Sequence, residues 1–217
     1  MLRVNKEDAS PLPASEAARL QPHLLALLAP GAYDALIFED YDKGLLSPAV
    51  IEPVMARAQE LGIPVAVDPK FRNFFAYGGA TLFKPNLKEL SEALGQPVHR
   101  ADMDEVRAAV LALRARMPHR LTLATLSELG VLLCDESGAF RHIPAHFRQI
   151  VDVSGAGDTV VSVMTAFLAA GLPPSTAAAL ANLAGGLVCE RVGVVPIDRA
   201  TLVQEAQRLL LERALVA

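Results

Sequence analysis

The strongest constraint on the fold is a set of four short segments that are apolar on both faces and alternate with helical patterns. These segments lie at residues 35–38, 64–67, 81–83 and 121–124. A strand with one face in water alternates apolar and polar residues, whereas a strand of a parallel sheet is covered by helices on both faces. The alternation therefore predicts a three-layer, doubly wound α/β fold with a mostly parallel sheet.

Helical patterns fill most of the chain between and after these strands. Most begin at a polar or proline residue typical of a helix start, and several end at a glycine. They cover residues 48–61, 86–94, 103–117, 159–170, 175–190 and 198–215. Two further apolar segments, residues 131–134 and 140–143, flank Asp135-Glu136-Ser137-Gly138. This arrangement predicts a hairpin, so we expect an antiparallel region after the parallel one.

The beginning of the chain does not match the usual start of such a fold. A doubly wound domain usually begins with a central strand, yet residues 1–13 are polar and contain prolines, and the first buried strand comes only near Ala35. We therefore expect a single domain over residues 1–217 that is truncated at its N-terminus. Missing first strands would leave an apolar sheet edge unpaired, which a second copy or a partner chain would cover.

Composition and charge argue against several classes of function. A net charge of −4 and a pI near 5.7 disfavour nucleic-acid binding, which needs a clustered basic surface. The polar N-terminus lacks a signal peptide, and the apolar segments are too short for a membrane span. Cys134 and Cys189 fit no metal or disulfide spacing and are expected to be buried. We expect a cytoplasmic protein.

The clearest chemical motif is Asp152-Val153-Ser154-Gly155-Ala156-Gly157-Asp158, directly before the helix predicted from residue 159. Small residues let a ligand approach the backbone. We expect the amides of Gly155, Ala156 and Gly157 to point outward, unpaired, at a helix N-terminus that favours an anion. Asp158 would then take a proton from a hydroxyl while the amides neutralise a phosphate. The alternative is a tight turn with Asp158 as a simple acid at a helix start.

This motif resembles the signature of the ribokinase/PfkB carbohydrate kinases, in which the final aspartate is the catalytic base. Three more segments occur in the family's order. Asn86-Leu87-Lys88-Glu89 resembles its N-x-x-E motif, residues 125–130 resemble the segment beside the nucleotide, and residues 181–182 resemble the adenine-side helix. The resemblance implies a ribokinase-like fold, ATP and Mg²⁺ as cofactors, and a sugar or sugar phosphate as substrate.

Within the family, the chain is most similar to the heptose-7-phosphate kinases. Residues 2–8, 39–44, 67–70 and 79–86 carry this likeness. Family members also have an N-terminal portion with the first strands, a lid and most sugar-contacting residues. Nothing in this chain matches that portion, and Ser127 stands where the family more often has glycine.

The motifs and the positions of charged residues after the strands lead to a set of candidate site residues. The base is Asp158, and residues 155–157 form the anion hole. The family resemblance implies that Asn86 and Glu89 organise Mg²⁺ through water, and it makes Asp152 a candidate ligand for a monovalent cation such as K⁺. The acceptor side is formed by Asp40 and Lys43, which follow the first strand at the sheet edge where ligands bind in open α/β folds. The nucleotide side is formed by Thr125, Ser127, Gly130, Asn182 and Lys70.

Several of these residues have equally ordinary structural interpretations. Asn86 and Glu89 have the spacing of a capping box at a helix start. Asp152 either binds a cation or fixes the loop. Asp40 and Lys43 either contact substrate or form a solvated turn. Lys70, after the next strand, either attracts phosphate or is likewise a solvated residue.

Two functions of different class are compatible with these features. The first is ATP-dependent phosphorylation of a hydroxyl on a sugar or sugar phosphate, which we predict. The second is an incomplete or non-catalytic nucleotide-binding module, or half of a split kinase that needs a partner chain. A dinucleotide-dependent oxidoreductase is disfavoured because no G-x-G-x-x-G follows a first strand.

Overall fold

The centre of the molecule is a six-stranded sheet in the order β1-β2-β3-β4-β5-β6. The computed structural model describes residues 9–146 and 149–216, with side chains as far as residue 210. The parallel strands are β1 (Leu36–Glu39), β2 (Val65–Asp68), β3 (Leu82–Phe83) and β4 (Leu121–Thr125). Two antiparallel strands, β5 (Val131–Cys134) and β6 (Phe140–Ile143), complete the sheet. Both the parallel region and the hairpin were predicted, and both are confirmed.

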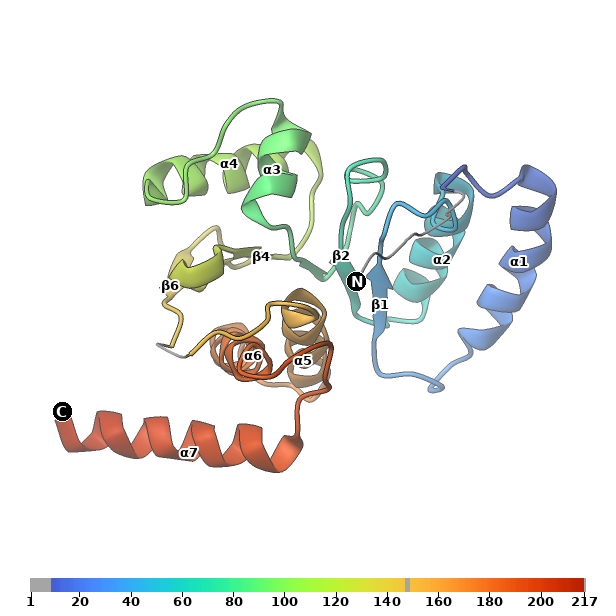
Figure 1. The fold of residues 1–217 in the computed structure, drawn as a ribbon. Helices are drawn as coiled ribbons and strands as arrows, with labels where there is room; N and C mark the ends of the chain where they lie inside the picture. The colour runs from blue at the N-terminus through green and yellow to red at the C-terminus, as the bar shows by residue number, and fades with distance from the viewer. Residues whose placement is uncertain (1–8, 147–148, 217) are drawn as a thin grey trace, which may run out of the picture.

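Helices cover both faces of this sheet and form three layers. One face carries α2 (Pro48–Glu60), α3 (Leu87–Leu94) and α4 (Met103–Arg116), and the other carries α5 (Ala156–Ala169) and α6 (Pro174–Val188). Figure 1 shows α3 and α4 above the sheet and α5 and α6 below it. In β2, Val65 and Val67 pack into the first core and Ala66 into the second. Burial on both faces explains why residues 65–67 of this strand are all apolar.

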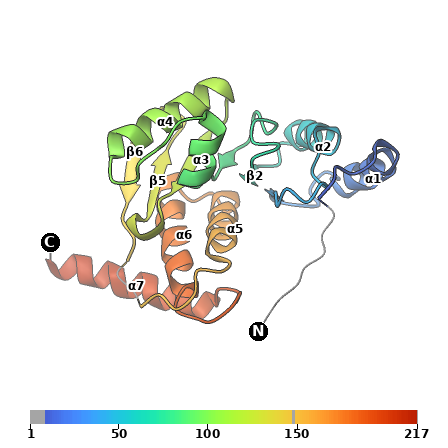
Figure 2. The same ribbon diagram turned by 45° about the horizontal axis from the view of Figure 1, so that its top comes forward.

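Two helices lie outside the three layers. The first, α1 (Ala14–Leu27), packs against α2, and the sequence analysis did not predict it. The last, α7 (Arg199–Val216), packs against α6 through Leu202, and Figure 2 shows it extending away from the sheet. Over residues 9–146 and 149–216, none of the helices has the length and apolar character that crossing a bilayer requires.

Most helix starts confirm the capping signals. Asp102 accepts hydrogen bonds from the first-turn amides of α4, and Asp198 accepts one from Thr201 at the start of α7. The α5 helix is a correction, because it begins at Ala156 and not at the predicted residue 159. Part of the glycine motif is therefore helical. The heptose-kinase likeness in residues 2–8 lies outside the described residues.

The strand order brings the carboxyl ends of four parallel strands to one edge. Each crossover moves one strand further in the same direction, and Glu39 at the end of β1 lies beside Asp68 at the end of β2. Within the part of the chain that the structure describes, no strand pairs with the outer side of β1. The start of α5 lies at this same edge and meets the strand ends there, since Gly157 in its first turn adjoins the Asp68 side chain.

Candidate active site

A cavity of about 550 Å³ opens where the parallel strands end and α5 begins. Strands β2 and β4 contribute their last residues, Asp68 and Thr125, and Lys84 follows directly after β3. The glycine-rich side of α6 forms another wall through Gly185. The structure brings most of the predicted residues together here, namely Lys70, Asn86, Glu89, Thr125, Ser127, Gly130, Ala156, Gly157, Asp158 and Asn182.

The two predicted acceptor-side residues do not line this cavity. Asp40 is only 3% exposed, and its carboxylate accepts hydrogen bonds from the Tyr77 hydroxyl at 2.9 Å and from Asn73 Nδ2 at 3.3 Å. Lys43 is exposed and lies outside the cavity lining. Asp40 thus holds the loop after β1 to the residues around Tyr77, which is the role of a structural carboxylate.

The glycine motif differs from the prediction in one of its three amides. Gly155 is the N-cap of α5 and has φ +77°, a left-handed conformation that favours glycine. The Ala156 amide is not free, because it donates to the Val153 carbonyl at 3.2 Å. Within the described residues, the amides of Gly155, Gly157 and Asp158 have no acceptor. Unpaired amides are therefore left at the start of α5, where the helix dipole favours negative charge.

Asp152 fixes the loop that leads into this motif. Its Oδ1 accepts from the Ser154 amide at 2.9 Å and from the Ser154 hydroxyl at 2.8 Å, and its Oδ2 accepts from the Gly193 amide at 2.9 Å. These hydrogen bonds lower the pKa of Asp152, with the Ser154 amide as the largest cause. The carboxylate joins two loops, which is the loop-fixing role that the sequence left open.

A buried ion pair below Gly157 is the main feature that the sequence analysis missed. Lys84 Nζ lies 3.0 Å from Asp68 Oδ2, and the two side chains are 3% and 10% exposed. A Cβ atom built on Gly157 would lie 3.5 Å from Lys84 Nζ, so the ammonium group faces the start of α5 directly. The available signal was a lysine directly after an entirely apolar strand, at the carboxyl end where ligands bind.

A second cluster lies beside the first, at the start of α3. The Asn86 side chain accepts from the Glu89 amide at 2.9 Å, and Glu89 accepts from the Asn86 amide at 2.8 Å, which confirms a capping box. Glu89 also accepts a hydrogen bond from Lys70, whose Nζ is 3.9 Å from Asp68 Oδ1. Burial lowers the pKa of Lys70, but its acidic neighbours outweigh this and raise it. Four residues thus form a chain of alternating charge, Glu89–Lys70–Asp68–Lys84.

Asp68 is the least satisfied member of this chain. Burial raises its pKa, and the Lys84 charge opposes that effect. Its Oδ1 is buried and has no hydrogen-bond partner among the described residues. A buried carboxylate oxygen without a hydrogen bond has a free-energy cost, and a cation or a hydrated ligand at the cavity floor would relieve it.

The opposite wall is built around a tight turn between β4 and β5. Gly130 has φ +89° and ψ −131°, and a Cβ there would lie 2.2 Å from the Ile143 carbonyl oxygen, so only glycine fits. Asn182 on α6 reaches across the cavity, and its Nδ2 donates to the Pro144 carbonyl at 2.9 Å. These contacts hold the hairpin side of the cavity to the helix side.

Ser127, in the same turn, has φ +54°, which is uncommon for a residue with a Cβ. We expect Ser127→Gly to raise the free energy of unfolding by about 0.5–1 kcal/mol, because glycine adopts this backbone without strain. Urea unfolding of the two proteins measures the difference. Ser137→Gly, in the hairpin turn, is a control without positive φ and should not stabilise the protein.

A metal site made only of protein side chains is not found among the described residues, since no three His, Cys, Asp or Glu side chains gather to hold an ion. Asn86 and Glu89 nevertheless line the cavity. Oxygen ligands of this kind fit Mg²⁺ that retains waters and is bound mainly by phosphates.

Comparisons with known proteins identify the family. The model of the pfkB family carbohydrate kinases matches residues 14–199. The bifunctional protein HldE of Methylobacillus flagellatus is 43% identical over 211 residues, which are 95% of this chain and 42% of that protein. The bifunctional protein HldE of Rhodospirillum rubrum is 41% identical over 202 residues, 93% of this chain and 40% of that protein. The chain thus spans about two fifths of these relatives.

Solved structures show the same fold at low sequence identity. Escherichia coli phosphofructokinase-2 in complex with potassium has a TM-score of 0.77 and 21% identity, over 89% of this chain and 62% of that one. Arabidopsis thaliana ribokinase complexed with ribose and ATP has a TM-score of 0.70 and 17% identity, over 90% and 59%. The fold is therefore ribokinase-like, as predicted. Together with the family match, these findings establish that the chain belongs to the pfkB family of carbohydrate kinases.

Proposed function

We propose that this chain transfers the terminal phosphoryl group of ATP to a hydroxyl of a sugar or sugar phosphate, with Asp158 as the base. The observation that carries the proposal is the position of this carboxylate. It stands in the first turn of α5, in the cavity, beside free amides and close to the Lys84–Asp68 ion pair. A carboxylate next to an anion site disfavours binding by itself, so a role in proton transfer accounts for it better.

The cationic groups of the cavity would bind the phosphates. The free amides at residues 157 and 158 and the dipole of α5 attract negative charge from one side. The ammonium group of Lys84 lies next to Gly157, and Lys70 lies beside Glu89 in the first turn of α3. Charge that develops on a phosphoryl group in transfer would be stabilised by donors that are already in place.

Asn86 and Glu89 would hold Mg²⁺ through water, as the family resemblance implies. The ion would neutralise phosphate charge and align the transferring group. This role and the capping box use the same residues.

We expect Asn86→Ser to keep the cap and leave stability within about 0.5 kcal/mol of wild type, because serine is an equally good N-cap. Turnover at limiting Mg²⁺ should fall about 10–100-fold, as for other groups that organise a metal.

The control for this variant is Asp102→Ser at the start of α4, which exchanges an N-cap that lies outside the cavity. It should leave the Mg²⁺ dependence of turnover unchanged. Equal Mg²⁺ dependence in Asn86→Ser and wild type would mean that Asn86 is only a cap.

The proposed acceptor is a heptose 7-phosphate. It rests on the resemblance of residues 39–44 and 67–70 to heptose-7-phosphate kinases and on the identity to HldE proteins. K⁺ binding near Asp152 is also proposed from the family resemblance. Asp152 accepts hydrogen bonds from Ser154 in its own loop and from Gly193 in a neighbouring loop. K⁺ would act by stabilising these two loops beside the proposed anion site.

The test is ATP turnover by the full chain with and without D-glycero-D-manno-heptose 7-phosphate, ribose or fructose 6-phosphate. We expect ADP formation that depends on an acceptor and is fastest with the heptose phosphate. ATP binding without acceptor-dependent turnover would contradict the kinase proposal. That result would favour the incomplete nucleotide-binding module. The relevant observation is the outer side of β1, which pairs with no other strand of the described residues.

A further inference from the structure

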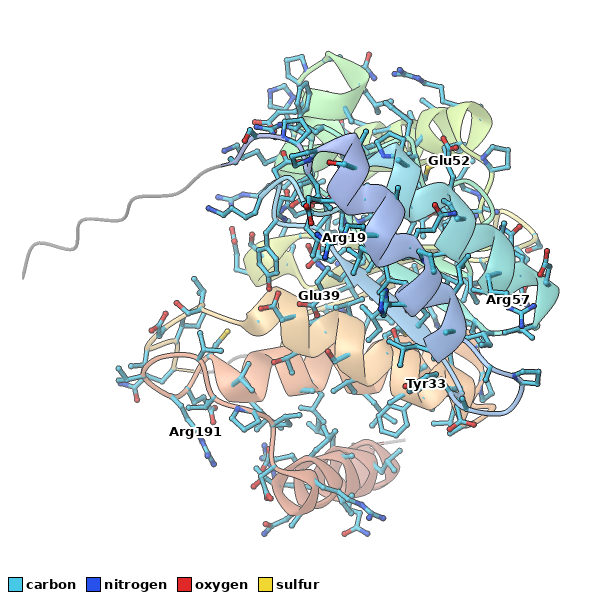
Figure 3. All side chains as sticks on the ribbon, turned by 90° about the vertical axis from the view of Figure 1, so that its right-hand side faces the viewer. Arg19, Tyr33, Glu39, Glu52, Arg57 and Arg191 are labelled. Carbon is cyan, nitrogen blue, oxygen red and sulfur yellow. The ribbon has the colours of Figure 1, made fainter. Side chains whose placement is uncertain are left out.

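The phenol of Tyr41 joins the end of β1 to the start of α5. Its hydroxyl lies 3.1 Å from Glu39 Oε2 and 3.3 Å from Asp158 Oδ2, although Asp158 comes 117 positions later in the chain. Figure 3 shows Glu39 beside α5, between the helix and the end of the strand. A side chain that follows the edge strand therefore reaches the carboxylate that we propose as the base.

The phenol has one proton and donates it to one carboxylate at a time. Partial burial, together with the negative charges of Asp158 and Glu39 and the hydrogen bonds to them, raises the pKa of Tyr41 to about 12. Burial also raises the pKa of Glu39, and the charge of Asp158 contributes. Tyr41 is therefore protonated near neutral pH and acts only as a donor between two acids.

The exposure of Tyr41 separates it from a structural tyrosine. Tyr41 as a residue is 54% exposed, whereas Tyr77, which donates to Asp40, is fully buried. The backbone that follows is irregular, with φ +55° at Asp42 and φ +84° at Gly44. A half-exposed ring is held mainly by its hydrogen bonds, so it can turn between the two carboxylates without disturbing a core.

We propose that Tyr41 is a positioning residue for Asp158, an inference that rests on the proposed function. Without an acceptor, the phenol donates to Asp158 Oδ2 and fixes the carboxylate. When an acceptor hydroxyl arrives, the phenol donates to Glu39 instead, and Oδ2 is free to receive the acceptor's proton. That proton moves to Asp158 while the acceptor oxygen bonds to the γ-phosphorus. The bond from phosphorus to the bridging oxygen breaks, and its electron pair leaves with ADP. The tyrosine proton stays on Tyr41 throughout.

The first test compares Tyr41→Phe with Tyr33→Phe, which removes a phenol of similar exposure (50%) that lies ahead of β1. In Tyr41→Phe, loss of a hydrogen bond to the charged carboxylate should move the acid limb of kcat/KM upward by about 0.5–1 pH unit. The KM for ATP should stay within about twofold. An acid limb that overlays wild type would overturn the proposal. The charged groups around this point are Glu39 on β1, Asp68 on β2, Lys70 after β2, Lys84 after β3 and Asp158 on α5.

The second test needs no turnover, so it separates this inference from the kinase proposal. The chain has three tyrosines and no tryptophan, and phenolate absorbance therefore reports on the tyrosines alone. Asp158→Asn removes one negative charge and should lower the pKa of Tyr41 by about one unit. The variant should therefore contain more phenolate than wild type at about pH 11, measured by absorbance directly after a pH jump.

This increment must vanish in the double variant Tyr41→Phe/Asp158→Asn. No increment in Asp158→Asn, or the same increment in both backgrounds, would show that the phenol and the carboxylate do not meet in solution. Should Asp158→Asn not fold, Glu39→Gln replaces it with the same expected direction, because the Glu39 charge also raises the pKa of Tyr41.

Discussion

Replacement of Asp158 by asparagine is expected to lower kcat by about 10²–10⁴, the usual effect of removing a general base. Asparagine has the same shape but cannot accept the acceptor's proton at neutral pH. In free energy, the loss corresponds to about 2.7–5.4 kcal/mol of transition-state stabilisation. ATP should bind at least as tightly as before, because one negative charge is removed beside the phosphate site. Turnover and ATP binding, measured on the same preparation, check both statements.

The control addresses the alternative that Asp158 is only an acid at a helix start. Asp104 lies in the first turn of α4, so Asp104→Asn removes a comparable interaction with a helix dipole away from the cavity. Both variants should lose about 0.3–1 kcal/mol of stability, but only Asp158→Asn should lose turnover. Turnover of Asp158→Asn within about threefold of wild type would refute the assignment of the base.

Replacement of Lys84 by methionine is expected to be the most destabilising change at the site, by about 3–5 kcal/mol. Methionine keeps much of the volume, so the loss is mainly electrostatic. Asp68 would remain as a buried charge without its 3.0 Å partner, and its Oδ1 already has no hydrogen bond among the described residues. Urea unfolding measures the loss. Adding Asp68→Asn should recover much of it, because the double variant buries no charge.

The pH dependence of this loss follows from Asp68. Burial raises its pKa above the unfolded value, and Lys84 opposes the rise, so removing the lysine raises it further. A carboxyl group whose folded pKa is raised adds stability below its unfolded pKa and loses it as the pH rises through the folded pKa. The penalty of Lys84→Met should therefore be smaller at about pH 4 than at about pH 7.5.

Lys88→Met is the matched control for Lys84→Met, because Lys88 is 83% exposed and makes only a surface ion pair with Glu92. It should change stability by less than about 0.5 kcal/mol at either pH. A penalty for Lys84→Met as small as this, or one that grows on acidification, would contradict the electrostatic account of the buried pair.

The parts of the fold that the sequence predicted well are those with strong local signals. The strands were found because burial on both faces leaves uniformly apolar segments, as in β2. The first helix was missed because residues 1–13 are polar and contain prolines, and no helical pattern was assigned between them and the first strand. In the structure Pro13 is the N-cap of α1, and Pro22 lies inside it. Packing against α2 stabilises a helix that local propensity disfavours.

The site shows the same division between local and tertiary signals. The glycine motif and the capping box at Asn86 are consecutive in sequence, and their placement was predictable. The partnership of Lys84 with Asp68 depends on two neighbouring strands, and that of Tyr41 with Asp158 joins residues 117 positions apart in the chain. Asp40 was predicted as a site residue because it follows β1 at the sheet edge where ligands bind, and Tyr41 was not singled out. Only the structure shows that the Asp40 carboxylate accepts a hydrogen bond from the buried Tyr77 hydroxyl.

The contact between Gly185 on α6 and Val160 on α5 limits how this cavity can be redesigned. A Cβ at position 185 would lie 2.6 Å from Val160 Cγ2, so a single added carbon would push apart the helix that carries Asp158 and the helix that carries Asn182. Under the proposed function, position 185 is therefore closed to substitutions that would alter nucleotide preference. Substitutions meant to admit a different base belong at Ala145, Ile150 and Val153, which line the same cavity on solvent-exposed loops.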